Sequence, residues 1–298
     1  MTLRRAFVVG LPYLWLLVFF LAPFLIVLKI SLSDAAISQP PYMPLLNLSD
    51  GWQGIRDFLA GLDSESFKWV WQDNLYKKAF LSSLIIATIS TCLCLLIGFS
   101  IAYGMARAPK RWRLYLLIAV IVPFWTSFLI RVYAWIGILR TEGLMNQFLL
   151  WTGVISDPLQ VMNTNLAVYI GIVYTYLPFM VLPIYASLDK MDDSLLEAAI
   201  DLGCSRLKAF WLVTVPLAKP GIIAGCFLVF IPVTGEFVIP DLLGGSSTLM
   251  MGKILWTEFF SNRDWPVASA VAVYLLVALL VPIVAAQRHF ERQQEKRR

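Results

Sequence analysis

The chain has 298 residues, of which 59% are hydrophobic and only 14% are charged, and its formal net charge is +5. Soluble domains usually carry about 25% charged residues, so this composition excludes an ordinary soluble domain. The apolar residues gather in runs long enough to cross a bilayer, which takes about 20 residues in a helix. These runs are far longer than the strands of a membrane barrel, and backbone groups in hydrocarbon must satisfy their own hydrogen bonds, so we predict helices.

The predicted fold is an all-α membrane protein in which residues 1–298 form one transmembrane domain. The first apolar run follows Arg4 and Arg5, and it is longer than the roughly 7–15 apolar residues of a cleaved signal peptide. We therefore expect it to be retained as a span. In chain order, the six predicted spans are 6–30, 79–105, 114–138, 166–188, 221–239 and 267–286.

Lys and Arg are concentrated in the connections on one side of these spans, which indicates the cytoplasmic side. Both termini and the connection 189–220 are therefore predicted to be cytoplasmic. This topology accounts for the positive net charge, so no nucleic-acid partner is expected. The basic residues of this side are Arg4, Arg5, Arg107, Lys110, Arg111, Arg113, Lys190, Arg206, Lys208, Lys219, Arg288, Arg292, Lys296, Arg297 and Arg298.

The first outside connection, 31–78, is the longest. Its "SQPPYMP" stretch cannot be helical, because proline lacks an N–H and restricts the residue before it. Two later stretches, "DGWQGIRDFLAGL" and "SFKWVWQDNLYKKAF", are typical of short amphipathic helices. Their Trp and Tyr residues favour anchoring at the membrane interface over docking of a partner.

The connection 189–220 is charged and amphipathic although it lies between two predicted spans. Ser194 precedes Glu197 by three residues, the spacing of a capping box at a helix N-terminus. Gly203 can end that helix, since glycine takes the left-handed C′ conformation without strain. The pattern predicts a short helix followed by a sharp turn.

Ser205 can cap a second helix over 206–214, and Pro216 lies past its expected end. A DNA-binding helix-turn-helix would show a similar turn. The connection is too short to hold a DNA-binding domain with its own core, so that alternative is set aside.

The sequence contains no G-x-x-x-x-G-K-[ST] motif, so we expect no ATP-binding P-loop and no cofactor in this chain. The spacing of its cysteines and of His289 predicts no metal site and no catalytic group. Energy for transport would have to come from a partner or from an ion gradient.

At the connection 189–220 the sequence resembles the signature cytoplasmic loop of ABC-importer permeases. The match consists of Glu197, Ala198, Ala199 and Gly203, followed by "VTVP" at 213–216. The family usually has isoleucine and leucine where this ending has two valines, a mild departure. The resemblance implies a type I ABC-importer permease without catalytic activity, whose coupling helix docks into a groove on a separate ATPase subunit.

The resemblance extends over nearly the whole chain after Leu11. It implies a bacterial inner-membrane importer of putrescine or a related polyamine, with a second homologous permease, two copies of an ATPase that carries ATP-Mg, and a periplasmic polyamine-binding protein. The stretches that resemble the polyamine branch, closest to the putrescine-importer permease, are "PFWTSFLIRVYAWIGIL", "TNLAVYIGIVYTYLPFMVLPIY", "FIPVTGEFVIPDLLGG" and "FFSNRDWPVASAVAVYLL".

A path for a polyamine needs acceptor oxygens and aromatic faces. Glu236 and Asp241 lie near the outer end of the fifth span, where Gly235 and Pro240 would interrupt the helix. Acids near a helix centre cost about 2.5–3.5 kcal/mol on insertion, so they usually face a cavity or a partner. We predict that both acids line the path, with a structural pair or helix capping as the alternative.

Arg131 lies inside the third predicted span and would repel a cationic cargo. We expect it to pair with a carboxylate, Glu236 being one option, or with backbone carbonyls, and to hold that span in place. A sulfate or phosphate cargo would instead make Arg131 central. The candidate path aromatics are Trp125, Tyr133 and Phe237, with Trp135, Tyr174 and Tyr176 as further options.

Two other classes of function stay open at this point. A gradient-driven secondary transporter would need a relay of intramembrane acids or histidines, for which Glu236 is the credible member. A membrane scaffold or sensor could recruit a cytoplasmic protein through the same loop, but it would need no polar path.

Overall fold

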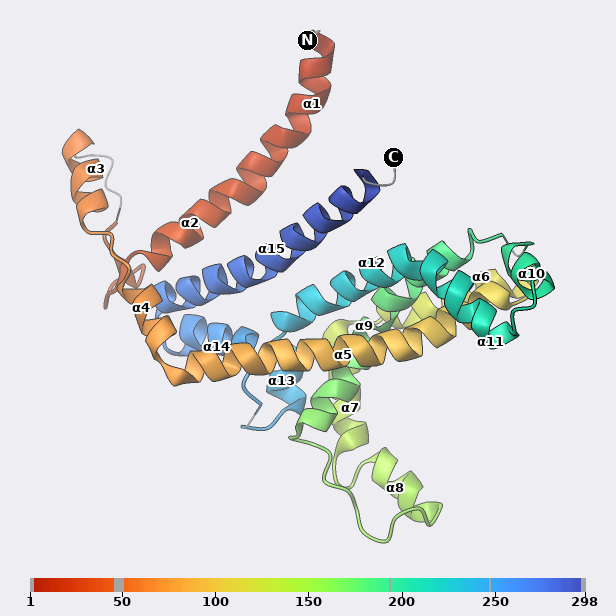
Figure 1. Cartoon of the computed structure of the whole chain (residues 1–298). Coiled ribbons are helices and arrows are strands. Elements are labelled where there is room, and N and C mark those ends of the chain that lie inside the picture. The colour runs from red at the N-terminus through yellow and green to blue at the C-terminus, as the bar shows by residue number, and fades with distance from the viewer. Residues whose placement is uncertain (1–2, 46–50, 193, 247, 296–298) are drawn as a thin grey trace. The chain divides into compact units, whose positions relative to one another are not determined.

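The computed structural model describes residues 3–45, 51–192, 194–246 and 248–295, and it is mostly helical (Figure 1). The chain forms two compact units, one made of residues 1–79 and 251–298 and the other of residues 80–250. The boundary falls inside helix α5 (Asn74–Arg107), which begins in the first unit and continues in the second.

The first unit begins with a long helical segment made of α1 (Leu3–Leu16), the π-helical turn η1 (Leu17–Leu21) and α2 (Ala22–Ser31). The proline-rich stretch that follows is non-helical, as predicted, and it contains an antiparallel hairpin of β1 (Asp34–Ala35) and β2 (Tyr42–Met43). The two amphipathic helices predicted in this connection are also confirmed, as α3 (Gly51–Ala60) and α4 (Glu65–Gln72).

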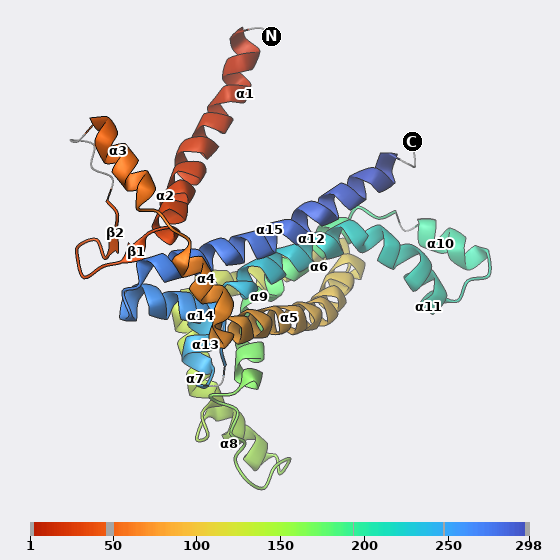
Figure 2. The same ribbon diagram turned by 60° about the vertical axis from the view of Figure 1, so that its left-hand side comes forward.

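The rest of the first unit packs around α15 (Trp265–Glu295), which contacts α2, α4 and α14 (Met251–Trp256) (Figure 2). The π-helical turn η5 (Thr257–Ser261) connects α14 to the start of α15. The Tyr274 hydroxyl donates a hydrogen bond to the Phe67 carbonyl (3.2 Å), and Tyr76 donates to Glu258 (2.9 Å). These bonds join the N-terminal and C-terminal parts of the chain within this unit.

The second unit is built around the close pair α9 and α12, which lie side by side in both views (Figures 1 and 2). In chain order after α5, its elements are α6 (Lys110–Ile121), η3 (Val122–Trp125), α7 (Phe128–Leu139), α8 (Leu144–Trp151), α9 (Asn165–Leu188), α10 (Ser194–Asp201), α11 (Arg206–Ala209), η4 (Phe210–Thr214), α12 (Val215–Thr234) and α13 (Val238–Leu243).

Two glycines of α12 allow this close approach to α9. A Cβ on Gly221 would collide with the backbone of Pro183, and one on Gly225 would collide with Met180. Small residues let helix backbones approach in membranes, where van der Waals packing drives association. Met180 is fully buried in the resulting core.

The predicted span 114–138 is not one continuous helix. The helical segments Lys110–Trp125 and Phe128–Trp151 are bent by 90° relative to each other. The cause is local, because Thr126 and Ser127 both have extended ψ angles (149° and 138°). This part of the chain is therefore a broken span or a re-entrant segment.

Four helices in the described part of the chain are long and apolar enough to cross a membrane, or five if the bent pair counts as one span. They cover most of the first, second, fourth and fifth predicted spans. The sixth predicted span falls on a shorter apolar helix, Trp265–Val281. The total of six spans stays a prediction.

Candidate functional site

The connection 189–220 contains the short helix and the sharp turn that the sequence predicted. Helix α10 ends at a left-handed glycine, because Gly203 has φ = +86°. The Gly203 N–H bonds the Ile200 carbonyl (2.8 Å), and the Cys204 N–H bonds the Ala199 carbonyl (3.1 Å). This pair of bonds is a Schellman motif, which satisfies carbonyls at the helix end. The prediction for Gly203 is confirmed.

The N-terminal caps of the two short helices differ in outcome. The Ser205 hydroxyl accepts a hydrogen bond from the Lys208 N–H (3.3 Å), which confirms Ser205 as a cap. The capping box was wrong in detail, because Ser194 is the first helical residue and its N–H donates to the Asp192 carboxylate (3.0 Å). The hydrogen bonds from Ser194 lower the pKa of Asp192.

The sequence predicted that the second helix ends before Pro216, and this prediction is wrong. Helix α11 continues through η4 into α12, so one helical segment runs from Arg206 to Thr234. The π-helical turn explains the continuity, since the Val215 N–H bonds the Phe210 carbonyl five residues back. A π-turn changes the hydrogen-bond register where Pro216, which has no N–H, enters the helix.

Helix α10 leaves apolar side chains uncovered by the described part of the chain, and none of its residues is buried. Leu195 is 48% exposed, and Leu202, just after the helix, is 87% exposed. Glu197 and Ala198 are exposed and Ala199 is half-buried. The loop therefore presents an apolar surface next to a glycine elbow.

A second site lies where three stretches of the second unit meet. It is an open cavity of about 480 Å³. Both helix breaks border it, one between η3 and α7 and the other between α12 and α13, and the middle of α9 forms the wall between them. The lining residues are Phe124, Phe128, Arg131, Thr175, Tyr176, Phe179, Pro232, Gly235, Glu236, Phe237 and Val238. We call this the central cavity.

Glu236 is held by hydrogen bonds in the wall of the central cavity, where it is 8% exposed. Its Oε1 accepts from the N–H groups of Phe237 (3.1 Å), Val238 (3.0 Å) and Ile239 (3.5 Å), and so it caps the N-terminus of α13. Its Oε2 accepts from the Tyr176 hydroxyl (2.5 Å). The interruption predicted at Gly235 is confirmed, and the capping alternative for Glu236 describes its contacts.

Arg131 lies in the same cavity and does not have the partners that we expected. Its side chain is 9% exposed, and its Nε and Nη1 have no hydrogen-bond partner. Its Cζ lies 4.9 Å from the ring centroid of Phe124 and 6.0 Å from that of Phe128. It forms no ion pair with Glu236 or with another described carboxylate. Contact with two aromatic rings thus takes the place of the predicted carboxylate or carbonyl pairing.

The other predicted path residues are distributed unevenly. Phe237 lines the central cavity, whereas Asp241 is exposed and lies outside its lining. Trp125 is 79% exposed and Tyr133 is 58% exposed, and neither lines the cavity. The structure therefore gathers some of the predicted residues, and a path role stays a prediction for all of them. Among the further options, Trp135 and Tyr174 contact each other edge to face (5.4 Å).

Three aromatic residues of the cavity were missed by sequence reasoning, namely Phe124, Phe128 and Phe179. The Phe124 and Phe179 rings meet edge to face (5.2 Å), and the Phe179 and Tyr176 rings lie 6.1 Å apart. Phe124 and Phe128 flank the extended Thr126–Ser127 pair, so the sequence did contain a signal for these two cavity residues. That signal could have been used only if the helix break had been predicted first.

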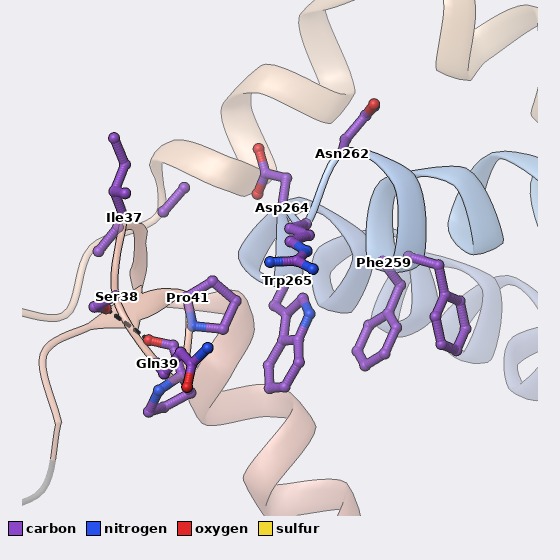
Figure 3. Close-up of a pocket in the computed structure, with 13 residues that line it drawn as sticks. Ile37, Ser38, Gln39, Pro41, Phe259, Asn262, Asp264 and Trp265 are labelled. Carbon is purple, nitrogen blue, oxygen red and sulfur yellow. Dashed lines mark hydrogen bonds between the residues drawn. The ribbon is translucent and has the colours of Figure 1, made fainter.

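The first unit holds a separate cavity of about 770 Å³ between the β1–β2 loop and the η5–α15 turn. Figure 3 shows Trp265 beside Phe259, and their rings are stacked with centroids 4.8 Å apart. Asp264 Oδ1 accepts from the Val267 N–H (3.0 Å) and caps α15, and burial raises the pKa of Asp264. These contacts account for Asp264 as a structural group.

Comparison with known proteins places the chain in a family. Residues 94–295 match the binding-protein-dependent transport system inner membrane component family. The spermidine/putrescine transport system permease protein PotB of Escherichia coli K12 is 46% identical over 207 residues, covering 70% of this chain and 75% of that protein. PotB of Haemophilus influenzae is 44% identical over 209 residues, covering 70% of this chain and 73% of that protein.

A solved structure shares the fold along nearly the whole chain. It is a bacterial alginate ABC transporter in complex with an alginate pentasaccharide-bound periplasmic protein. The TM-score is 0.71 at 15% sequence identity, and the alignment covers 97% of this chain and 96% of that chain. This chain therefore shares its fold with a chain of that ABC transporter.

The chain belongs to the inner-membrane permease components of binding-protein-dependent transport systems. It is a multi-pass inner-membrane protein and a transport subunit, and its relatives include polyamine permeases. The resemblance found in the sequence is confirmed at the level of the family.

Proposed function

We propose that this chain is one permease subunit of an ATP-driven importer for putrescine, spermidine or a related polyamine. The relatives that share 44–46% of aligned residues are named as spermidine/putrescine permeases. The central cavity supports such a cargo, because it combines a carboxylate with five aromatic rings. An ammonium over an aromatic ring gains about 0.5–2 kcal/mol.

The observation that carries the mechanism is the helical segment from Arg206 to Thr234. This segment begins just after the Gly203 elbow and is capped at its other end by Gly235, beside Glu236. Its 29 residues span about 43 Å at 1.5 Å per residue. A displacement of the loop would therefore reach the central cavity through one continuous helix.

In this proposal, α10 docks on a cytoplasmic ATPase through its exposed apolar side chains together with Glu197, Ala198 and Ala199. Two copies of that ATPase bind ATP-Mg, and this chain supplies no cofactor. A second homologous permease completes the path, and a periplasmic polyamine-binding protein delivers the cargo. Both termini are cytoplasmic, and six spans cross the membrane.

The six proposed spans are α1–α2, α5, the broken segment α6–α7, α9, α12 and α15. Broken helices often form the substrate sites of transporters, because unwound backbone is tolerated in a membrane where it lines a cavity. The central cavity is bordered by two helix breaks beside the middle of α9. We therefore place the cargo path there, with Glu236, Tyr176 and Phe237 in its wall.

The test is uptake of labelled putrescine in cells that lack this gene and in cells where it is restored, with excess spermidine and with an ionophore. We expect restored uptake that survives collapse of the ion gradient while ATP is maintained. Loss on gradient collapse alone would favour a secondary transporter. If uptake is not restored although the other subunits are present, the assignment of a polyamine as cargo is overturned. Recruitment of a cytoplasmic protein through the connection 189–220, without any uptake, would favour a membrane scaffold.

A further inference from the structure

Arg131 places a positive charge in the wall of a cavity that we assign to a positively charged cargo. The side chain is nine-tenths buried, and two of its nitrogens, Nε and Nη1, have no hydrogen-bond partner. Buried charges are normally paired and hydrogen-bonded, because they lose their hydration. Arg131 instead rests on the rings of Phe124 and Phe128, so few directional bonds hold it in place.

The ring faces under Arg131 are the ones that an incoming ammonium would use. The Phe124 ring contacts Phe179, and the Phe179 ring contacts Tyr176, whose hydroxyl bonds Glu236. An aromatic wall therefore runs from the guanidinium to the carboxylate. One end of this wall already carries a cation, and the other end carries the anion.

We propose that Arg131 is the resident cation of the central cavity and lowers the affinity of the cavity for cationic cargo, most strongly for cargo with two ammonium groups. This inference rests on the proposed function, in which the cavity lies on the cargo path. While the guanidinium covers Phe124 and Phe128, an incoming ammonium meets an occupied ring face and a like charge. Cargo binds when Arg131 leaves the rings.

The cost of moving Arg131 off the rings is the same for every amine that takes its place, so this cost does not discriminate between amines. The repulsion from the guanidinium does discriminate, because it acts on each ammonium of the cargo. A monoamine carries one ammonium, whereas a diamine can place one on the rings and direct the other toward Glu236. Arg131 therefore weakens the binding of a diamine more than the binding of a monoamine.

The test compares putrescine with butylamine, which has the same four-carbon chain and only one ammonium. Equilibrium binding of each labelled amine is measured on the assembled transporter in lipid nanodiscs, without binding protein and without ATP. The variants are Arg131→Met, which removes the charge at similar length, and Arg131→Lys, which keeps it. Arg140→Met removes the same charge from the end of α7, where the side chain is exposed and outside the central cavity.

We expect Arg131→Met to bind putrescine about tenfold more tightly than the wild type, with a smaller gain for butylamine. The preference for putrescine over butylamine then widens. Arg131→Lys should keep a preference close to that of the wild type, and Arg140→Met should match the wild type. A purely structural Arg131 would alter the yield of assembled transporter without changing this ratio.

The inference is overturned if assembled Arg131→Met binds putrescine with unchanged or lower affinity. If that variant does not assemble, Arg131→Gln carries the same expectation, because it lacks the charge but keeps polar groups. The variant Glu236→Gln distinguishes failure of the proposed cargo path from failure of the proposed role of Arg131. If it leaves putrescine binding unchanged, the cavity is not the cargo site and the proposed path fails; if it abolishes binding while Arg131→Met leaves the preference intact, only the role of Arg131 fails.

Discussion

The connection 189–220, called the loop below, and the central cavity belong to the same unit of the chain but are built in different ways. The loop is shaped by hydrogen bonds between near neighbours in the chain, at Gly203 and Ser205, and its apolar side chains point away from the described chain. The cavity is assembled from three separate stretches, and its charged side chains point inward.

This difference indicates how one region can receive the movement of a partner while another region binds the cargo. A loop with local hydrogen bonds keeps its shape when it moves as a body, which suits docking on a partner. A cavity bounded by two helix breaks changes when any of its three walls moves, which suits alternating access. The helix from Arg206 to Thr234 links the two. The experiments below act on one region and measure the other.

The largest effect is expected for Gly203→Val. At φ = +86° a β-branched residue is strained by about 1–3 kcal/mol. An added Cβ would meet no neighbouring atom within 4 Å, so the effect comes from the backbone and not from a collision. The elbow should change direction, and uptake per ATP hydrolysed should fall by at least about tenfold. The measurement is the ratio of uptake to ATP hydrolysis in proteoliposomes.

Gly203→Asn is the matched control, because asparagine tolerates the left-handed conformation better than other side chains. It should retain most of the coupling. If Gly203→Val and the wild type show the same ratio of uptake to ATP hydrolysis, the elbow has no role in the mechanism. The loop and the central cavity would then not be mechanically linked through Gly203.

Glu236→Gln should have the next largest effect. The amide keeps an acceptor for the α13 cap but loses the charge, and a hydrogen bond to a charged group contributes about 1.5–3 kcal/mol. We expect the KM for polyamine uptake to rise, or its maximal rate to fall, by about tenfold. Tyr176→Phe leaves the cap intact and removes one bond, so it should show a smaller loss.

Normal uptake kinetics in Glu236→Gln would mean that the carboxylate serves the helix cap alone. A fall in thermal stability without a change in uptake by the assembled transporter would lead to the same conclusion. Measuring both quantities on one preparation distinguishes a path role from a structural role.

A moderate effect is expected for Ser205→Ala. The change removes the hydroxyl that accepts from the Lys208 N–H, and losing an N-cap of this kind costs about 1 kcal/mol of helix stability. Coupling should weaken by less than in the Gly203 variant. Hydrogen exchange of the loop should increase, while that of α9 stays unchanged. Faster exchange in α9 as well would show that the loop is not locally stabilised.

Asp241→Asn should have the smallest effect on uptake. Asp241 is exposed and lies outside the lining of the central cavity, although it follows Glu236 by only five residues. We expect uptake within about twofold of the wild type, since surface substitutions usually cost less than about 0.5 kcal/mol. A loss as large as that of Glu236→Gln would restore the predicted pair of path acids and place the path beyond the central cavity.

The sequence by itself determined the features that depend on near neighbours in the chain. Hydropathy located the long helices, and the spacing of Gly203 and Ser205 set the turn and the second cap of the loop. These predictions hold because helix ends are stabilised within a few residues. The errors at Ser194 and Pro216 are also local, and they arose because a cap can shift by a residue or two and a π-turn can carry a proline.

Only the tertiary structure decided which distant side chains share the central cavity. It brought Glu236 to Tyr176, placed Arg131 on Phe124, and left Asp241, Trp125 and Tyr133 outside. Those outcomes depend on the 90° bend after η3 and on the close approach of α9 and α12, which the glycines of α12 allow. Hydropathy ranks residues by their preference for lipid, but it does not say which of them face each other, because that depends on how separate helices pack.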